Sequence, residues 1–131
     1  MSQPHPEHKN NFIISIVDDN ADMQRLVRAM LSADSRLVLL PEINSAEDAI
    51  RSVEVHSPSL VILDHTLKGE MTGLEAAPLI RRVSPSTKVL LFSAHELSKE
   101  VRGEPAVDYY LPKTKVCELL PTVLNILNRV L

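Results

Sequence analysis

Five short apolar segments alternate with five stretches of helical periodicity along this 131-residue chain. The apolar segments are typical of buried strands and lie at residues 12–17, 37–40, 60–63, 88–92 and 107–111. Helices are expected between and after them, at residues 21–33, 45–56, 96–102 and 116–131, and from after the loop marked by Gly69 and Gly73 to about residue 83. In the first helix, the spacing of Met23, Leu26, Val27, Met30 and Leu31 predicts one apolar face. Because the connections are short, this alternation predicts an α/β fold, a parallel sheet with helices on both of its faces.

Local residues mark several helix ends. Ser45 is expected to cap a helix, with Asp48 near the position of a capping acid. Pro78 and Pro121 fall inside helical patterns, where a proline removes a backbone donor. We therefore expect a late helix start or a kink at each proline.

The length of the chain suits one domain with a real core but not two. Residues 1–10 are polar and carry two prolines and two histidines, so we interpret them as a flexible tail before a domain at residues 11–131. No apolar run approaches the ~20 residues that cross a bilayer, and no signal-peptide pattern is present. Cys117 is the single cysteine and cannot form an internal disulfide, which favours a cytoplasmic location. We expect its side chain to pack in the core.

Polar residues stand where the predicted strands end. Asp18 and Asp19 follow the first strand, Asp64 the third and Ser93 the fourth, and the fifth leads to Lys113. Ligands of open parallel sheets collect outside the carboxyl ends of the strands, so we expect these side chains to meet there.

Three carboxylates at one edge of a sheet would repel one another and raise at least one pKa. A hard divalent cation removes that penalty, and Mg²⁺ prefers a few oxygen ligands together with water. A cation, a carboxylate nucleophile and a lysine together form a site suited to phosphoryl transfer.

Four short motifs in this order resemble the CheY-like response regulator receiver family. They are IVDD, VILD, LFSA and YLPK, which end at Asp19, Asp64, Ala94 and Lys113. The resemblance covers residues 12–131. It implies a (βα)5 flavodoxin-like, doubly wound parallel sheet with strand order 2-1-3-4-5.

The resemblance also assigns a role to each acid. It implies that Asp64 is the phosphoacceptor and a metal ligand, that Asp19 binds Mg²⁺ directly and that Asp18 helps through water. The backbone carbonyl of Thr66 would be a further ligand, and Mn²⁺ could substitute for Mg²⁺. His95 and Thr66 match positions beside the pocket that tune the lifetime of the phosphoryl group.

Three further residues match functional positions of the family, of which Ser93 and Tyr110 would form its switch. Ser93 corresponds to the hydroxyl residue that binds the phosphoryl oxygen, and Lys113 to the lysine that pairs with the acyl phosphate. Pro112 precedes Lys113, where a cis peptide could position it. Tyr110 corresponds to the aromatic residue that turns inward when the hydroxyl moves. Strand alternation should send Tyr109 to the opposite face.

The implied function is that of a phosphoacceptor in a two-component phosphorelay. A sensor histidine kinase or phosphotransfer protein would donate the phosphoryl group, and the face formed by the fourth helix, fifth strand and last helix would then change. The downstream partner is open, and a phosphorylation-dependent dimer is possible. We expect no membrane contact. The net charge of -3 and the absence of a DNA-binding segment after the final helix predict no nucleic-acid contact on this chain.

Two other functions are compatible with the fold. One is a binding module that no longer accepts phosphate, although such modules usually lack an acid or the lysine. The other is an aspartate-nucleophile phosphohydrolase, which would place a second acid where Thr66 stands. We therefore expect no enzymatic activity beyond the chain's own phosphoryl transfer and slow autodephosphorylation.

The sequence departs from the family in three places. Lys68 stands where the family usually has a proline, and the run from Asp64 to Gly73 is one residue longer than usual. The segment between Ser93 and Lys113 is shorter, which predicts a short fourth helix.

Overall fold

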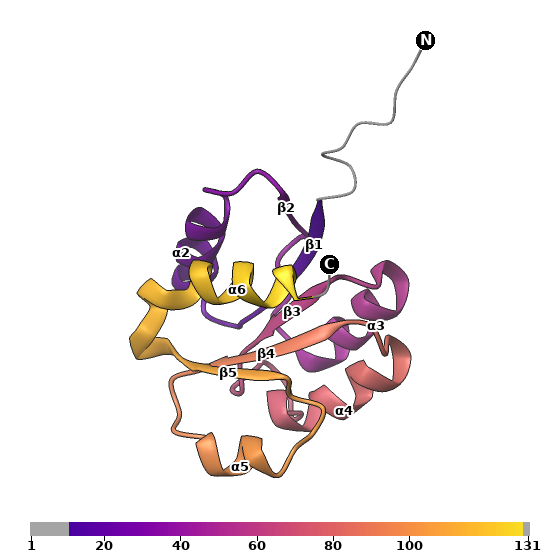
Figure 1. The fold of residues 1–131 in the computed structure, drawn as a ribbon. Coiled ribbons are helices and arrows are strands. Elements are labelled where there is room, and N and C mark those ends of the chain that lie inside the picture. Colours follow the sequence, from indigo (N-terminus) through magenta and orange to yellow (C-terminus); the bar gives the residue numbers. More distant parts are fainter. Residues whose placement is uncertain (1–10, 130–131) are drawn as a thin grey trace.

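A computed structural model describes residues 11–129 and contains one five-stranded parallel sheet in the order β2-β1-β3-β4-β5 (Figure 1). The strands are β1 (Phe12–Val17), β2 (Leu37–Leu39), β3 (Leu60–Leu63), β4 (Lys88–Ser93) and β5 (Tyr109–Pro112). The predicted fold class and strand order are confirmed. The predicted tail at residues 1–10 lies outside the described residues, so the domain boundary there stays a prediction.

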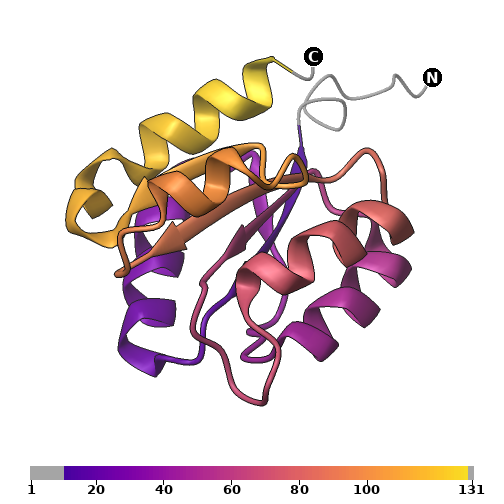
Figure 2. The same cartoon turned by 90° about the horizontal axis from the view of Figure 1, so that it is seen from below.

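Helices follow the strands and cover both faces of the sheet (Figure 2). They are α2 (Ala21–Leu31), α3 (Ala46–His56), α4 (Gly73–Val83), α5 (Ser98–Arg102) and α6 (Leu119–Asn128), with a 3₁₀ segment, η1 (Lys113–Glu118), before α6. Among the described helices, none combines the length and apolar character that a membrane span requires.

The core is divided between the two faces by strand alternation. Ile14 and Ile16 point to one face, where they pack with α2 and α6. Val61 and Leu63 point to the other face and pack with α3 and α4. All four residues of β3 are buried, because this strand lies at the centre of the sheet.

Several helix ends follow the sequence rules. Ser45 caps α3, and its side chain accepts a hydrogen bond from the backbone N–H of Asp48. Pro121 lies in the first turn of α6, because the predicted helix starts late, at Leu119. The predicted strand 107–111 is displaced towards the C-terminus, because Tyr109 is the first residue that pairs with β4.

The buried face of α2 differs from the predicted one. Leu26 is 44% exposed, although its spacing placed it on the apolar face. Val27 and Leu31 are buried, as their spacing predicts, and the third buried residue of the helix is Gln24. The helix is therefore rotated so that a polar residue enters the interior.

Pro78 does not delay the start of α4. The helix begins five residues earlier, at Gly73, and Thr72 and Glu75 form a reciprocal capping box at its N-terminus. Pro78 is thus an interior residue, and the carbonyl of Leu74 lacks the N–H that a normal residue would donate.

Replacing Pro78 with alanine should stabilise the protein by about 1–2 kcal/mol, because the lost hydrogen bond is restored at some cost in unfolded-state entropy. Urea unfolding measures this difference. Pro121→Ala is the matched control, because the N–H of an alanine at this position would lie in the first turn and have no intrahelical acceptor. Equal effects of the two substitutions would contradict the prediction.

Candidate functional site

The three predicted acids meet at the carboxyl edge of the sheet. Asp18 and Asp19 follow β1, and Asp64 follows the adjacent strand β3. One carboxylate oxygen from each acid lies within 4.8 Å of those of the others. Asp18 and Asp64 are buried, whereas Asp19 is exposed and faces solvent. The cluster therefore combines two shielded carboxylates with one that is open to water.

Lys113 closes the cluster from the end of β5. Its Nζ lies 2.8 Å from Oδ2 of Asp18 and 2.8 Å from Oδ2 of Asp64. Burial and the charge of Asp18 raise the pKa of Asp64, although the hydrogen bond from Lys113 opposes them. Burial lowers the pKa of Lys113, but its hydrogen bonds to Asp18 and Asp64 outweigh burial and leave that pKa raised.

The backbone around Asp64 is held by close packing. Its Oδ1 accepts a hydrogen bond from the N–H of His65 at 2.7 Å. The N–H of Gly73 donates to the carbonyl of His65 at 2.9 Å. A Cβ at Gly73 would lie only 2.2 Å from the carbonyl oxygen of Asp64. Only a glycine lets the N-terminus of α4 approach this closely.

The donor set fits a hard divalent cation. One ammonium group faces three carboxylates, so the cluster retains a formal excess of negative charge. Burial raises the pKa of Asp64, and the negative charge of Asp18 adds to that increase. Carboxylate oxygens are the ligands that such cations prefer, and the exposed Asp19 leaves a side open for water. The cluster could thus bind a metal ion.

The other predicted residues form a second group beside the acids. Ser93 is buried at the end of β4, and its Oγ accepts a hydrogen bond from the N–H of His95. Nε2 of His95 lies 3.0 Å from Oγ1 of Thr66. The hydroxyl of Tyr110 donates to the carbonyl of His95 and accepts from the N–H of Leu97. His95 therefore contacts all three of Ser93, Thr66 and Tyr110.

Two expectations near Lys113 are wrong. Among the described residues every peptide bond is trans, including the one before Pro112, because β5 stays extended through Pro112 to pair with Ser93. Cys117 is exposed, because it lies in η1 and the last α-helix starts two residues later. Tyr109 and Tyr110 do pack on opposite faces, as predicted.

Comparison with known proteins identifies the family. The family model described as "Response regulator receiver domain" matches residues 14–122. The chain belongs to this family. Its doubly wound sheet and acidic cluster are thus those of a receiver domain of two-component response regulators.

The receiver domain has relatives among longer regulators. It is 29% identical over 109 residues to the transcriptional regulatory protein NarL of Mycobacterium tuberculosis, covering 83% of this chain and 45% of NarL. It is 30% identical over 103 residues to the response regulator protein VraR of Staphylococcus aureus, covering 77% of this chain and 49% of VraR. The chain thus spans about half the length of these relatives.

Among solved structures, the signal receiver domain of Mycobacterium tuberculosis NarL superposes with a TM-score of 0.81 at 24% identity. The match covers 91% of this chain and 98% of that one. It confirms the fold that the strand order establishes.

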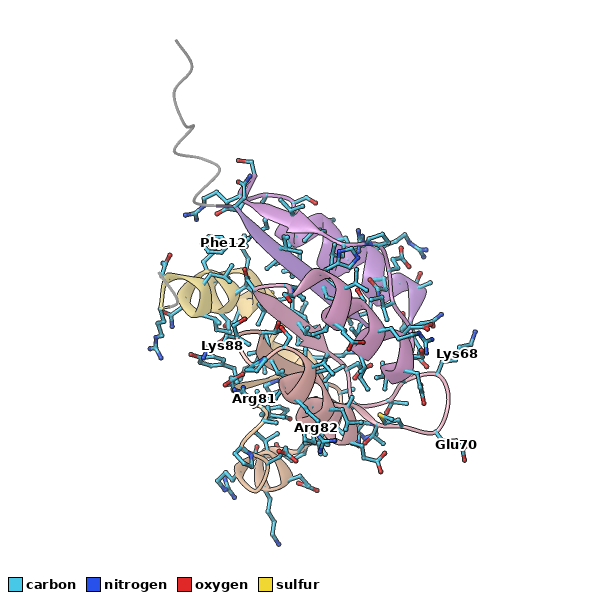
Figure 3. The ribbon with its side chains drawn as sticks, turned by 90° about the vertical axis from the view of Figure 1, so that its right-hand side faces the viewer. Phe12, Lys68, Glu70, Arg81, Arg82 and Lys88 are labelled. Carbon is cyan, nitrogen blue, oxygen red and sulfur yellow. The ribbon has the colours of Figure 1, made fainter. Side chains whose placement is uncertain are left out.

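Lys68, the departure from the usual proline, has a structural reason in this receiver domain. Its side chain projects from the loop after β3 (Figure 3). Its backbone N–H donates to the carbonyl of Asn44 at 2.9 Å, and it forms a parallel bridge with Ser45. A proline has no N–H and could not make this bond.

Two residues of the site were missed by the sequence analysis. Gly73 was read only as a loop marker, although its contact with Asp64 restricts it to glycine. Gln24 is buried on α2 and bonds the loop that carries Asp18. The spacing of Gln24 from Val27 and Leu31 could have indicated that it is buried. A polar residue on such an apolar stripe needs hydrogen-bond partners inside the protein.

Gly73→Ala should destabilise the receiver domain by about 2 kcal/mol or more, because the new methyl group meets the backbone of Asp64. Gly103→Ala is the matched control, since the nearest atom to its Cβ would be the Glu100 carbonyl oxygen, at 3.6 Å. Urea unfolding of both variants measures the difference. An equally small loss of unfolding free energy at both positions would contradict the prediction, because it would show that α4 can move away from Asp64 without destabilising the domain.

Proposed function

We propose that this receiver domain accepts a phosphoryl group on Asp64 from a histidine kinase or phosphotransfer protein and then changes its surface. The observation that carries the proposal is the convergence of Asp18, Asp19, Asp64 and Lys113 on one edge of the sheet. A carboxylate nucleophile, a candidate cation site and an ammonium group are the parts that phosphoryl transfer requires.

The cation proposed for this site is Mg²⁺, which Mn²⁺ could replace. Asp19 and Asp64 would bind it directly, Asp18 would act through water, and the carbonyl of Thr66 would be a further ligand. When bound, the cation would neutralise negative charge on the carboxylates and on the incoming phosphoryl oxygens.

In the proposed transfer, a carboxylate oxygen of Asp64 attacks the phosphorus of a phosphohistidine on the donor. The new O–P bond forms as the N–P bond breaks, and the imidazole leaves with the bonding electron pair. The hydrogen bond from Lys113 favours the carboxylate form of Asp64, because it opposes the pKa increase that burial causes. The ammonium group of Lys113 is also placed to pair with the phosphoryl oxygens.

The proposed switch uses the second group of residues. Ser93 accepts a hydrogen bond from His95 but keeps its own hydroxyl proton available for a phosphoryl oxygen. If Ser93 moves towards Asp64, the backbone of His95 and Leu97 must adjust, and Tyr110 is bonded to both residues. Phosphorylation would thereby favour a different arrangement of the face formed by α5, β5 and α6.

Thr66 and His95 are proposed to set the lifetime of the acyl phosphate. Their side chains are exposed and joined at 3.0 Å, and both residues follow strand ends that carry reacting groups. The pair would restrict the approach of water to the phosphoryl group on Asp64.

The partners are proposed at the level of class. The phosphodonor is a sensor histidine kinase or phosphotransfer protein, and the output is a protein or domain that recognises the switched face. A phosphorylation-dependent dimer is proposed to form through the same face.

The alternatives are less well supported. A binding module that had lost phosphorylation would not need Lys113 bridging Asp18 and Asp64. A phosphohydrolase needs a second acid near the nucleophile, and Thr66 occupies that position. A small-molecule phosphodonor separates the three functions, since it should give a stable acyl phosphate, no reaction or rapid turnover, respectively.

Asp64→Asn should abolish labelling by a small-molecule phosphodonor in the presence of Mg²⁺, because the amide cannot form the acyl phosphate. Asp22→Asn, on the exposed face of α2, is the control and should label like the unmodified protein. Intact-protein mass spectrometry measures the labelling. Labelling that persists in Asp64→Asn would place the acceptor elsewhere.

His95→Ala should shorten the acyl-phosphate lifetime several-fold, because the contact with Thr66 that limits water access is lost. The decay of the labelled protein after removal of the phosphodonor measures this lifetime. Lys99→Ala, exposed on α5, is the control. An unchanged lifetime in His95→Ala would remove the proposed role.

A further inference from the structure

Gln24 is a buried polar residue in an otherwise apolar stripe of α2. Its exposed fraction is 2%, and Val27 and Leu31 are its buried neighbours on the same side of the helix. A glutamine in such a position is costly unless its amide group is hydrogen-bonded.

The amide nitrogen of Gln24 contacts three backbone carbonyls. Nε2 lies 3.0 Å from the oxygen of Ile16, 3.2 Å from that of Asp18 and 3.0 Å from that of Ile43. The first two carbonyls belong to β1 and the turn after it, and the third belongs to the segment after β2. One side chain thus joins the two backbones beneath the acidic cluster.

The carbonyls of Ile16 and Asp18 need a donor because β2 ends early, at Leu39. The carbonyl of Ile14 accepts from the N–H of Leu40, directly after the last residue of β2. The carbonyls of Ile16 and Asp18 follow at two-residue intervals and so point to the same side of β1. The next backbone bond across this gap runs from the N–H of Asp18 to the carbonyl of Ile43. Gln24 fills the interval between the two bonds.

The orientation of the amide is fixed by these contacts. The reverse orientation would place Oε1 against three carbonyl oxygens. In the observed orientation Oε1 is buried and has no hydrogen-bond partner within residues 11–129. Leaving a buried acceptor unpaired is unfavourable, so the three donor contacts must outweigh that cost.

We propose that Gln24 is a positioning residue for the cation site. Its amide holds the peptide of Asp18 against the segment after β2, and this fixes the direction in which Asp18 and Asp19 leave β1 towards Asp64. The proposal rests on the proposed function, since it assigns Gln24 to the affinity of that same site for a divalent cation.

Titration with Mn²⁺ alone, with free Mn²⁺ followed by electron paramagnetic resonance, tests the proposal. Gln24→Met keeps the length of the side chain and removes its donors, and it should weaken Mn²⁺ binding about tenfold or more. Val27→Ala is the matched control, because it removes buried volume one turn along the same helix without touching the loop. It should lower the unfolding midpoint and leave Mn²⁺ affinity unchanged.

Two results would overturn the role of Gln24 while the proposed function stands. One is unchanged affinity in Gln24→Met, and the other is an equal loss of affinity in Val27→Ala. If the unmodified protein fails to bind Mn²⁺, or if Asp19→Asn binds it equally well, the result contradicts the proposed cation site. The proposed role of Gln24 is then contradicted as well. If Gln24→Met does not fold, the same titration is made with Gln24→Met in the Pro78→Ala background.

Discussion

The contact of one ammonium group with two buried carboxylates is the interaction on which the site depends. Lys113 joins Asp18 and Asp64 at 2.8 Å each, so the ends of three strands are held together by charge. Removing one member of such a group leaves an uncompensated buried charge, which is strongly unfavourable. The arrangement is nevertheless incomplete, because one positive charge balances three carboxylates only in part. The fold therefore presents an acidic edge whose charge is suited to a cation.

Backbone packing also helps to bring the acids to the same place. Gly73 lets α4 begin against the carbonyl of Asp64, where any larger residue would displace the end of β3. Gln24 joins the end of β1 to the segment after β2, where the ladder between the two strands has stopped. Neither residue carries the proposed chemistry. Both fix the directions from which Asp18 and Asp64 approach, and a shift of either strand end would separate the carboxylates.

The alternation of apolar and helical segments was enough to predict the sheet, and strand ends were enough to predict which acids meet. Both are local properties of the chain. The predictions of burial were wrong where contacts with distant parts of the chain determine which side chains are buried. Leu26 is exposed because the buried stripe of α2 includes Gln24, whose partners lie in β1, in the turn after it and in the segment after β2. Cys117 is exposed because η1 intervenes between β5 and the last helix, and no local residue marks that helix start.

The shortened segment after β4 has a mechanical consequence for the proposed switch. The helix α5 has five residues, no side-chain cap and no buried residue, so little free energy opposes its displacement. The loop before it is held by His95, which contacts Ser93, Thr66 and Tyr110, and by the buried Leu97, whose N–H also donates to Tyr110. In the proposed switch, a small movement of Ser93 would therefore reach Tyr110 through the backbone atoms of this segment. A long, well-packed helix at this position would oppose such a movement, whereas this one can follow it.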